Sequence, residues 1–164
     1  MIVDKMLVSE VGAKELMEIS AREAQRNKTP FDKDQALNIH KYAGCTACVA
    51  LITRSEIYCA NAGDSRCVIQ DGVKVKEMSI DHKADLPAEK RRIERAGGYV
   101  EEGRVNGILA VARAIGDFEY KQSPQVKAED QMVTAFPEVK VETLTNKNEY
   151  MLVACDGIWD CVTS

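Results

Sequence analysis

The sequence predicts an α+β fold, a layered sandwich of antiparallel β-sheets flanked by helices. Two features of the chain lead to this prediction. Apolar residues recur at helical spacing within residues 1–43, whereas residues 44–164 consist mainly of short apolar or alternating runs separated by glycine turns. We therefore expect residues 1–164 to form one domain, with a helical N-terminal part at 1–43 and a sheet-rich part at 44–164.

Three helices are expected. The first begins near Ser9 and ends before Pro30, because proline removes a backbone donor and restricts the residue that precedes it. The second covers residues 32–40. The third covers residues 88–96 and ends at a pair of glycines. Its many charges predict a solvated amphipathic helix, with Ile93 facing the core.

The strands differ in their expected burial. Near-continuous apolar runs at 45–53 and 150–155 predict strands covered on both faces, whereas alternation at 139–144 predicts a half-buried strand. Asp71-Gly72 predicts a tight hairpin, and the close turns indicate an antiparallel meander. Strands are expected at residues 45–53, 57–62, 66–70, 73–75, 139–144 and 150–155.

Composition and charge exclude some classes of function. The chain is 45% hydrophobic and 29% charged, and its 22 basic against 26 acidic residues give a net charge of -4. An acidic balance argues against nucleic acid as the main partner. No apolar run approaches the ~20 residues of a membrane-spanning helix, and the N-terminus does not have the pattern of a secretory signal. Six cysteines without such a signal indicate intracellular thiols, in the cytoplasm or nucleus.

Three aspartates are the first candidates for a functional site. Asp64, Asp117 and Asp156 each follow an apolar run and lie beside a glycine. A strand end is a rigid support, and the glycine allows a ligand to approach the backbone. Short carboxylates held in this way suit hard cations such as Mg²⁺ or Mn²⁺. The alternative is that each aspartate simply forms a turn.

Four motifs, in this order, resemble the metal-dependent protein phosphatase family of type 2C. They span most of the region from residue 44 to the C-terminus, and four ordered motifs are far more specific than a single glycine pattern. The motifs are ANAGDSR (60–66), DHKADLPAEKRRIERAGG (81–98), RVNGILAVARAIGDFEYK (104–121) and LVACDGIWDCV (152–162).

The resemblance implies a fold, an activity and a set of site residues. The family fold is a sandwich of two antiparallel sheets flanked by helices, and its members hydrolyse phosphoserine and phosphothreonine in proteins. Two Mg²⁺ or Mn²⁺ ions activate the attacking water, so no side chain is the nucleophile. Asp156 matches a metal-bridging ligand and Asp64 a ligand of a weaker metal site. Asp117 matches a loop-supporting position, and Arg104 in the family's flap is a candidate substrate contact or a solvated arginine.

The chain departs from the family pattern at both ends. It has no DGHGG motif, and Asp4 falls on that motif's metal ligand only if residues 4–11 are laid over it, with larger residues in place of the glycines. The alternative is an ordinary exposed N-terminal aspartate. The family's upstream acidic and arginine residues and its closing Asp-Asn motif are also absent from this sequence.

These departures change the expected function. We expect an incomplete sandwich, truncated or degenerate at both ends, whose phosphatase activity is weak or absent in this chain alone. A catalytically inactive phosphatase-like binding or regulatory module is the alternative. Unpaired sheet edges favour pairing with another chain, so a homodimer is also expected.

Some residues with reactive side chains are not expected to form a site. Cys45 and Cys48, three apart on a strand, point to opposite faces, and the cysteines are expected to be buried free thiols. His40 at a helix end is expected to be solvated, and His82 matches a turn of the family. Trp159 is expected to pack beneath the loop of Asp156.

Overall fold

The computed structural model describes residues 2–164, and the side chain of His40 lies outside what is described. The three helices expected from the sequence are present, one short helix precedes them and another follows them. The helices are α1 (Ile2–Leu7), α2 (Glu10–Asn27), α3 (Lys33–Tyr42), α4 (Pro87–Arg95) and α5 (Asp156–Trp159), with single 3₁₀ turns η1 (Phe118–Tyr120) and η2 (Ala128–Asp130).

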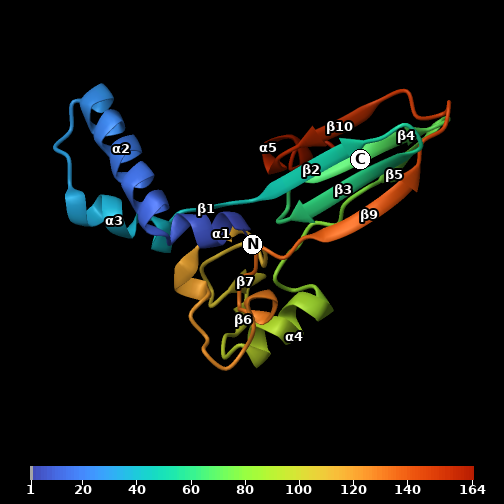
Figure 1. Cartoon of the computed structure of the whole chain (residues 1–164). Coiled ribbons are helices and arrows are strands. Elements are labelled where there is room, and N and C mark those ends of the chain that lie inside the picture. The colour runs from blue at the N-terminus through green and yellow to red at the C-terminus, as the bar shows by residue number, and fades with distance from the viewer. Residues whose placement is uncertain (1) are drawn as a thin grey trace.

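Capping side chains set the start of the two N-terminal helices. Ser9 Oγ accepts a hydrogen bond of 3.1 Å from the backbone N–H of Gly12, and Asp32 Oδ1 accepts one of 3.0 Å from that of Gln35. Figure 1 shows α2 and α3 as an arm that projects away from the sheets. No described residue of α2 is fully buried, so this arm has little core of its own.

Two three-stranded antiparallel sheets form the sandwich (Figure 1). One sheet has the order β2-β3-β9, with strands β2 (Ala47–Ile52), β3 (Glu56–Ala62) and β9 (Glu138–Thr143). The other has the order β10-β4-β5, with strands β10 (Met151–Ala154), β4 (Arg66–Asp71) and β5 (Lys74–Glu77). Two short pairs complete the pairing: β1 (Gly44–Cys45) with β8 (Ile115–Gly116), and β6 (Val100–Glu101) with β7 (Arg104–Val105). The predicted α+β layered sandwich is therefore confirmed.

The expected meander is wrong at one point, the turn between β3 and β4. These consecutive strands belong to different sheets, so the turn at Gly63 crosses from one layer to the other. Gly63 has φ 122°, and a Cβ added there would lie 2.4 Å from Thr46 Cγ2, so this turn requires glycine. Between the layers, Ile57 of β3 and Ile69 of β4 share one buried cluster.

The expectation that β2 and β10 are covered on both faces is also wrong. Val49 and Leu51 of β2 are 62% and 60% exposed, and Leu152 and Val153 of β10 are exposed as well. Each strand has a paired neighbour on one side only, because both lie at sheet edges. The apolar content reflects faces that other parts of the described chain leave uncovered. β9 alternates in burial, as predicted.

A second core lies beneath α4. Ile93 faces it, as expected, with Val105 and Val133 among its other buried members. The charged side of α4 is not simply solvated, because Glu89 and Arg92 are both buried. Glu89 pairs with Arg92 and Arg113, so a network of charges fixes the helix to the irregular segment beside it.

Candidate functional site

Asp64 and Asp156 lie at the same end of one strand pair. In the antiparallel register of β4 and β10, Ala154 is opposite Arg66. Asp64 comes two residues before Arg66, and Asp156 comes two residues after Ala154. Both aspartates therefore lie just beyond the same end of the two paired strands. The pairing of β4 with β10 thus places two acids that are 92 positions apart in the sequence at the same end of one sheet.

Asp64 is buried and already has a cationic partner. Its side chain is 7% exposed, and its Oδ2 lies 2.5 Å from Lys83 Nζ. Partial burial tends to lower the pKa of Lys83, but the hydrogen bond to Asp64 and the charges of Asp64, Asp81 and Asp160 outweigh it and raise that pKa. The ammonium therefore stays charged and neutralises Asp64.

Asp156 is the first residue of α5 and is exposed to solvent. One helical turn later, Asp160 adds a second negative charge, and it acts on Lys83. Our sequence reasoning did not select Asp160. The signal that could have found it is the spacing of four residues in DGIWD, which places two residues on one side of a helix.

Arg66 holds α5 against the end of β4. Its guanidinium donates to both carboxylate oxygens of Asp81, at 3.0 and 2.9 Å, and lies 5.1 Å from the centroid of the Trp159 ring. Trp159 Nε1 donates to the carbonyl of Ala154 at 2.8 Å. These contacts fix the helix that carries Asp156. Sequence reasoning missed Arg66, although it ends the ANAGDSR motif.

Asp4 does not share its hydrogen-bond partners with Asp64 or Asp156. Its Oδ1 accepts from the backbone N–H of Gly116 at 3.0 Å, and its Oδ2 accepts from Lys121 Nζ at 2.7 Å. Lys121 also donates to the carbonyl of Ala114 at 2.8 Å. Burial lowers the pKa of Lys121, and Asp4 opposes that effect. Asp4 thus ties α1 to the segment around β8, and its role as a metal ligand stays a prediction.

Asp117 is buried in a tight backbone arrangement. Its φ is 51°, and its N–H donates to the carbonyl of Ala43 at 3.0 Å. A Cβ on Gly44 would lie 2.0 Å from its Oδ2, so the carboxylate packs directly on that glycine. Burial raises the pKa of Asp117, while Lys121 lowers it. These contacts suit the loop-supporting role that the sequence suggests.

Arg104 is exposed on β7, and its Nη1 donates to the carbonyl of Ile108 at 2.7 Å. Figure 1 shows the β6–β7 hairpin below the sandwich and α5 at its upper side. The structure therefore does not bring Arg104 together with the acids at the end of β4 and β10. Its contact with substrate stays a prediction.

The acids do not form a two-metal centre in this arrangement. Two magnesium or manganese ions need many oxygen ligands. Among the described side chains of residues 2–164, no three of His, Cys, Asp or Glu are grouped so that they could hold an ion. Asp64 and Asp4 are each paired with a lysine instead. A pair of family-type ions does not fit the residues described.

The cysteines are free, as expected, but only some are buried. Cys48 Sγ and Cys59 Sγ are 3.8 Å apart inside the sandwich, and burial raises the pKa of Cys48 and of Cys67 to about 12. Such thiols are protonated and poor nucleophiles. The other three cysteines are exposed, which corrects the expectation that all are buried: Cys45, Cys155 and Cys161.

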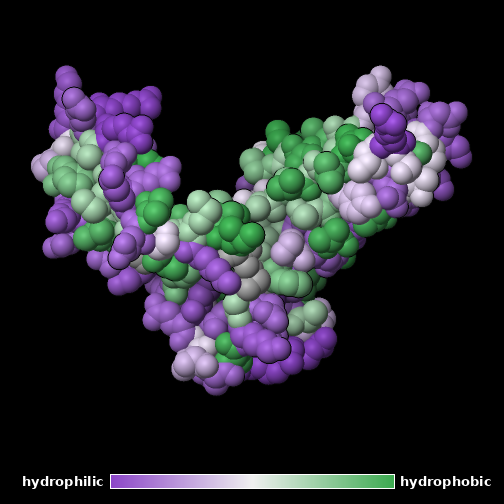
Figure 2. Space-filling model, in the orientation of Figure 1, coloured by the Kyte–Doolittle hydropathy of each residue, from purple (hydrophilic) through white to green (hydrophobic). Residues whose placement is uncertain are grey.

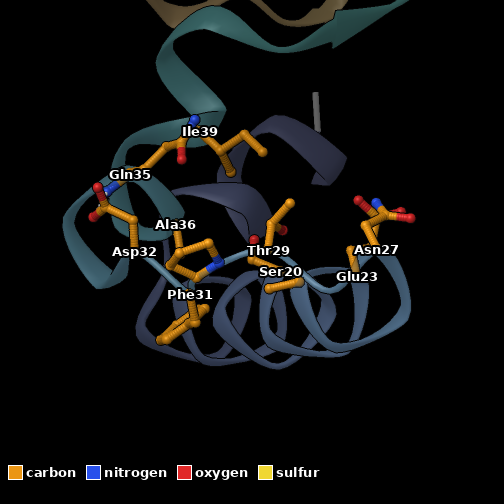
Figure 3. A pocket seen from close by; sticks show the side chains of 11 residues that line it. Ser20, Glu23, Asn27, Thr29, Phe31, Asp32, Gln35, Ala36 and Ile39 are labelled. Atoms are coloured by element: carbon orange, nitrogen blue, oxygen red, sulfur yellow. Dashed lines mark hydrogen bonds between the residues drawn. The ribbon is translucent and has the colours of Figure 1, made fainter.

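A separate pocket lies in the helical arm, between α2 and α3. Figure 3 shows Phe31, Ala36 and Ile39 on one side of it and Ser20 and Glu23 on the other. None of the candidate acids lines it. The pocket is therefore distinct from the site at the strand end.

Comparison with known proteins decides the family. A family model described as Protein phosphatase 2C matches residues 6–164. The chain belongs to the protein phosphatase 2C family.

Relatives within the protein phosphatase 2C family are similar over most of this chain. It is 54% identical over 132 residues to Protein phosphatase 2C homolog 2 of Hypocrea jecorina, a match that covers 78% of this chain and 30% of that protein. It is 44% identical to Protein phosphatase 2C 1 of Paramecium tetraurelia, over 96% of this chain and 48% of that protein. The chain thus spans less than half the length of these relatives.

Solved structures support the same fold. A serine-threonine phosphatase 2C from Toxoplasma gondii has a TM-score of 0.65 and 22% identity, over 96% of this chain and 62% of that one. A sex determining protein of C. elegans has a TM-score of 0.66 and 26% identity, over 94% of this chain and 35% of that one. Both are similar in fold to most of the chain.

Proposed function

We propose that this chain is part of a protein serine/threonine phosphatase, which hydrolyses phosphoserine and phosphothreonine in proteins with Mg²⁺ or Mn²⁺. The observation that supports this most is that Asp64 and Asp156 lie at the same end of the β4–β10 strand pair, in a chain that matches the family over residues 6–164. Residues 1–164 would form one partial domain of that enzyme.

The chain alone is proposed to have weak or no activity. Asp64 is engaged by Lys83 and Asp4 by Lys121, and the described residues do not provide the ligands of two ions. No metal-dependent step is therefore assigned to this chain by itself. Phosphoproteins remain the proposed substrates of the larger enzyme.

An inactive phosphatase-like binding or regulatory module is the second candidate. The two lysine–aspartate pairs favour it, because they neutralise acids that a metal enzyme would use as ligands. Such a module would keep the fold and its surface while lacking catalysis.

One experiment separates the two functions. Mn²⁺ is titrated calorimetrically into the chain and into Asp156→Ala, and both proteins are assayed for hydrolysis of a phosphothreonine peptide. The matched control is Asp71→Ala, which removes an exposed acid at the opposite end of β4. Binding that Asp156→Ala alone loses supports the phosphatase proposal. No binding in any of the three proteins means that the site needs the further segments of longer family members, and for this chain alone it favours the binding module.

A second copy of the chain is the proposed partner of the exposed sheet edges. The edge strands β2 (ACVALI) and β10 (MLVA) carry no charge, whereas the opposite edges β9 (EVKVET) and β5 (KVKE) carry several. Figure 1 shows β2 and β10 along one side of the sandwich, and Figure 2 shows apolar residues gathered there. Charges normally protect an edge from pairing, so the uncharged side is the one suited to self-association.

Sedimentation at increasing concentration tests the homodimer. Leu51→Lys, at the exposed edge, should shift the equilibrium toward monomer, whereas Val73→Lys at the β4–β5 turn should not. A chain that stays strictly monomeric at high concentration contradicts this proposal.

The location of the protein stays a prediction. Among residues 2–164 there is no helix whose length and hydropathy would allow it to cross a bilayer. Two predictions rest on the sequence alone. The protein is intracellular, in the cytoplasm or nucleus, and nucleic acid is not its partner.

A further inference from the structure

Lys83 pairs with a carboxylate, that of Asp64, which is almost inaccessible to water. The Asp64 side chain is 7% exposed, whereas that of Lys83 is 42% exposed. A buried carboxylate requires a counter-charge, because leaving it unpaired in a poorly hydrated place is costly. At this position, the counter-charge is the ammonium of Lys83.

The backbone of Lys83 is fixed on several sides. Its N–H donates to the carbonyl of Asp81 at 3.0 Å, its carbonyl accepts from the N–H of Leu86 at 3.2 Å, and it forms an isolated bridge with Val111. The side chain therefore reaches Asp64 from a rigid base. The pair is a feature of the fold rather than a chance contact of two mobile side chains.

The neighbouring charges favour the same pairing. Asp81 accepts two hydrogen bonds from Arg66, so its carboxylate already has a cationic partner. Asp160 adds negative potential at Lys83. The ammonium thus occupies the place among these aspartates where a divalent cation would experience the same attraction.

We propose that Lys83 is an internal counter-ion that competes with divalent cations for Asp64. A cation binds Asp64 only when the ammonium leaves it, and the partly exposed lysine stem gives that ammonium a path to water. The inference rests on the proposed function only for the assignment of Asp64 to a metal site.

The test is Mn²⁺ binding to three proteins: the chain, Lys83→Met and Lys76→Met. Lys83→Met removes the competing ammonium and keeps an unbranched side chain of similar length. Lys76→Met is the matched control, since it removes one positive charge from a pair with Glu142 on the sheets. Calorimetry should show Mn²⁺ binding to Lys83→Met about tenfold tighter or more, because no charged hydrogen bond has to be broken first.

Three further measurements test whether the effect is specific to Lys83 and Asp64. Adding Asp64→Asn to Lys83→Met should abolish the gain in affinity. Excess Mn²⁺ should raise the Tm of Lys83→Met more than that of the chain, since a cation that binds only the folded state stabilises it. Lys83→Arg retains the charge and should bind Mn²⁺ as weakly as the chain. This variant still tests the proposal if Lys83→Met fails to fold.

The outcomes separate this inference from the phosphatase proposal, because none of them depends on turnover. Unchanged or weaker Mn²⁺ binding by Lys83→Met overturns the competition, as does an equal gain in Lys76→Met. Tighter binding by Lys83→Arg also overturns it. A gain that is confined to Lys83→Met and needs Asp64 supports it, whether or not the protein hydrolyses a phosphopeptide.

Discussion

Lys121 Nζ lies 2.7 Å from Asp4 Oδ2 and joins the first helix to a segment 117 residues further along the chain. The two side chains are 7% and 14% exposed, so the pair is largely shielded from water. Asp4 also accepts the N–H of Gly116, which places α1 against β8. Asp4, which the resemblance to the family suggests as a metal ligand, thus fastens α1 to β8 in this structure, and its role as a ligand stays a prediction.

Asp4→Asn should therefore destabilise the fold. It removes the hydrogen-bonded counter-charge of the buried Lys121 ammonium, which costs about 3 kcal/mol in the free energy of unfolding. Urea denaturation measures this, with Glu10→Gln, an exposed acid of the next helix, as a control that should change little. If Asp4→Asn keeps its stability but loses Mn²⁺ binding, Asp4 is a metal ligand instead.

Gly63→Ala should be among the more damaging single-methyl additions. The new Cβ would lie 2.4 Å from Thr46 Cγ2, at a positive φ that side chains disfavour, so we expect a loss of about 2 kcal/mol or more. Gly103→Ala is the matched control, because Gly103 also has a positive φ but has no atom within 4 Å of the added Cβ. Thermal unfolding compares the two. Equal losses would show that the crossing between the layers tolerates a side chain.

The pKa of Glu89 predicts a fall in stability at acid pH. Burial tends to raise this pKa, but Arg113 and Arg92 outweigh it and hold it below its ordinary value of 4.5. A carboxyl whose pKa is lowered on folding stabilises the protein above its unfolded pKa, and that contribution is lost as pH falls through the folded pKa.

Glu89→Gln should remove this pH dependence and cost about 3 kcal/mol near neutral pH, since Arg92 and Arg113 lose the carboxylate that they share. Urea denaturation between about pH 7 and about pH 3 measures both effects. Glu94→Gln, in an exposed pair with Lys90, is the control. A variant with the same pH profile as the chain would show that Glu89 is not the titrating group.

Arg66→Ala should loosen α5. The arginine lies over Trp159, which is the single tryptophan of the chain, so its fluorescence reports on this helix. We expect a red-shifted emission as water reaches the indole, and a loss of about 1 kcal/mol. Arg54→Ala, at an exposed turn, should leave the spectrum unchanged. An unaltered emission in Arg66→Ala would mean that the stack does not hold the helix.

Local signals predicted most elements of the fold. Ser9 and Asp32 have the residue types that cap helices, and alternation predicted β9 correctly. The crossing at Gly63 was not predicted, because a short turn between two strands looks the same whether the strands pair or separate into two layers. Burial of the edge strands was overestimated, since an apolar run does not specify what covers it.

The sequence indicated the acids of the candidate site but not their partners. Asp64 and Asp156 are recognisable because each lies beside a glycine at a strand end. The partners of the acids are side chains distant in sequence, such as Lys121 for Asp4, and no local pattern indicates which lysine reaches which aspartate. Charge pairing is a property of the packed chain, and it decides whether an acid is free to bind a metal.

The most direct test of the account is turnover of a phosphothreonine peptide with saturating Mn²⁺. It compares the 164-residue chain with a version extended at both ends by the corresponding segments of a longer relative. We expect little or no hydrolysis by the chain, and hydrolysis by the extended protein that Asp156→Ala abolishes. An extended, folded protein without turnover would contradict the phosphatase proposal and favour the binding module.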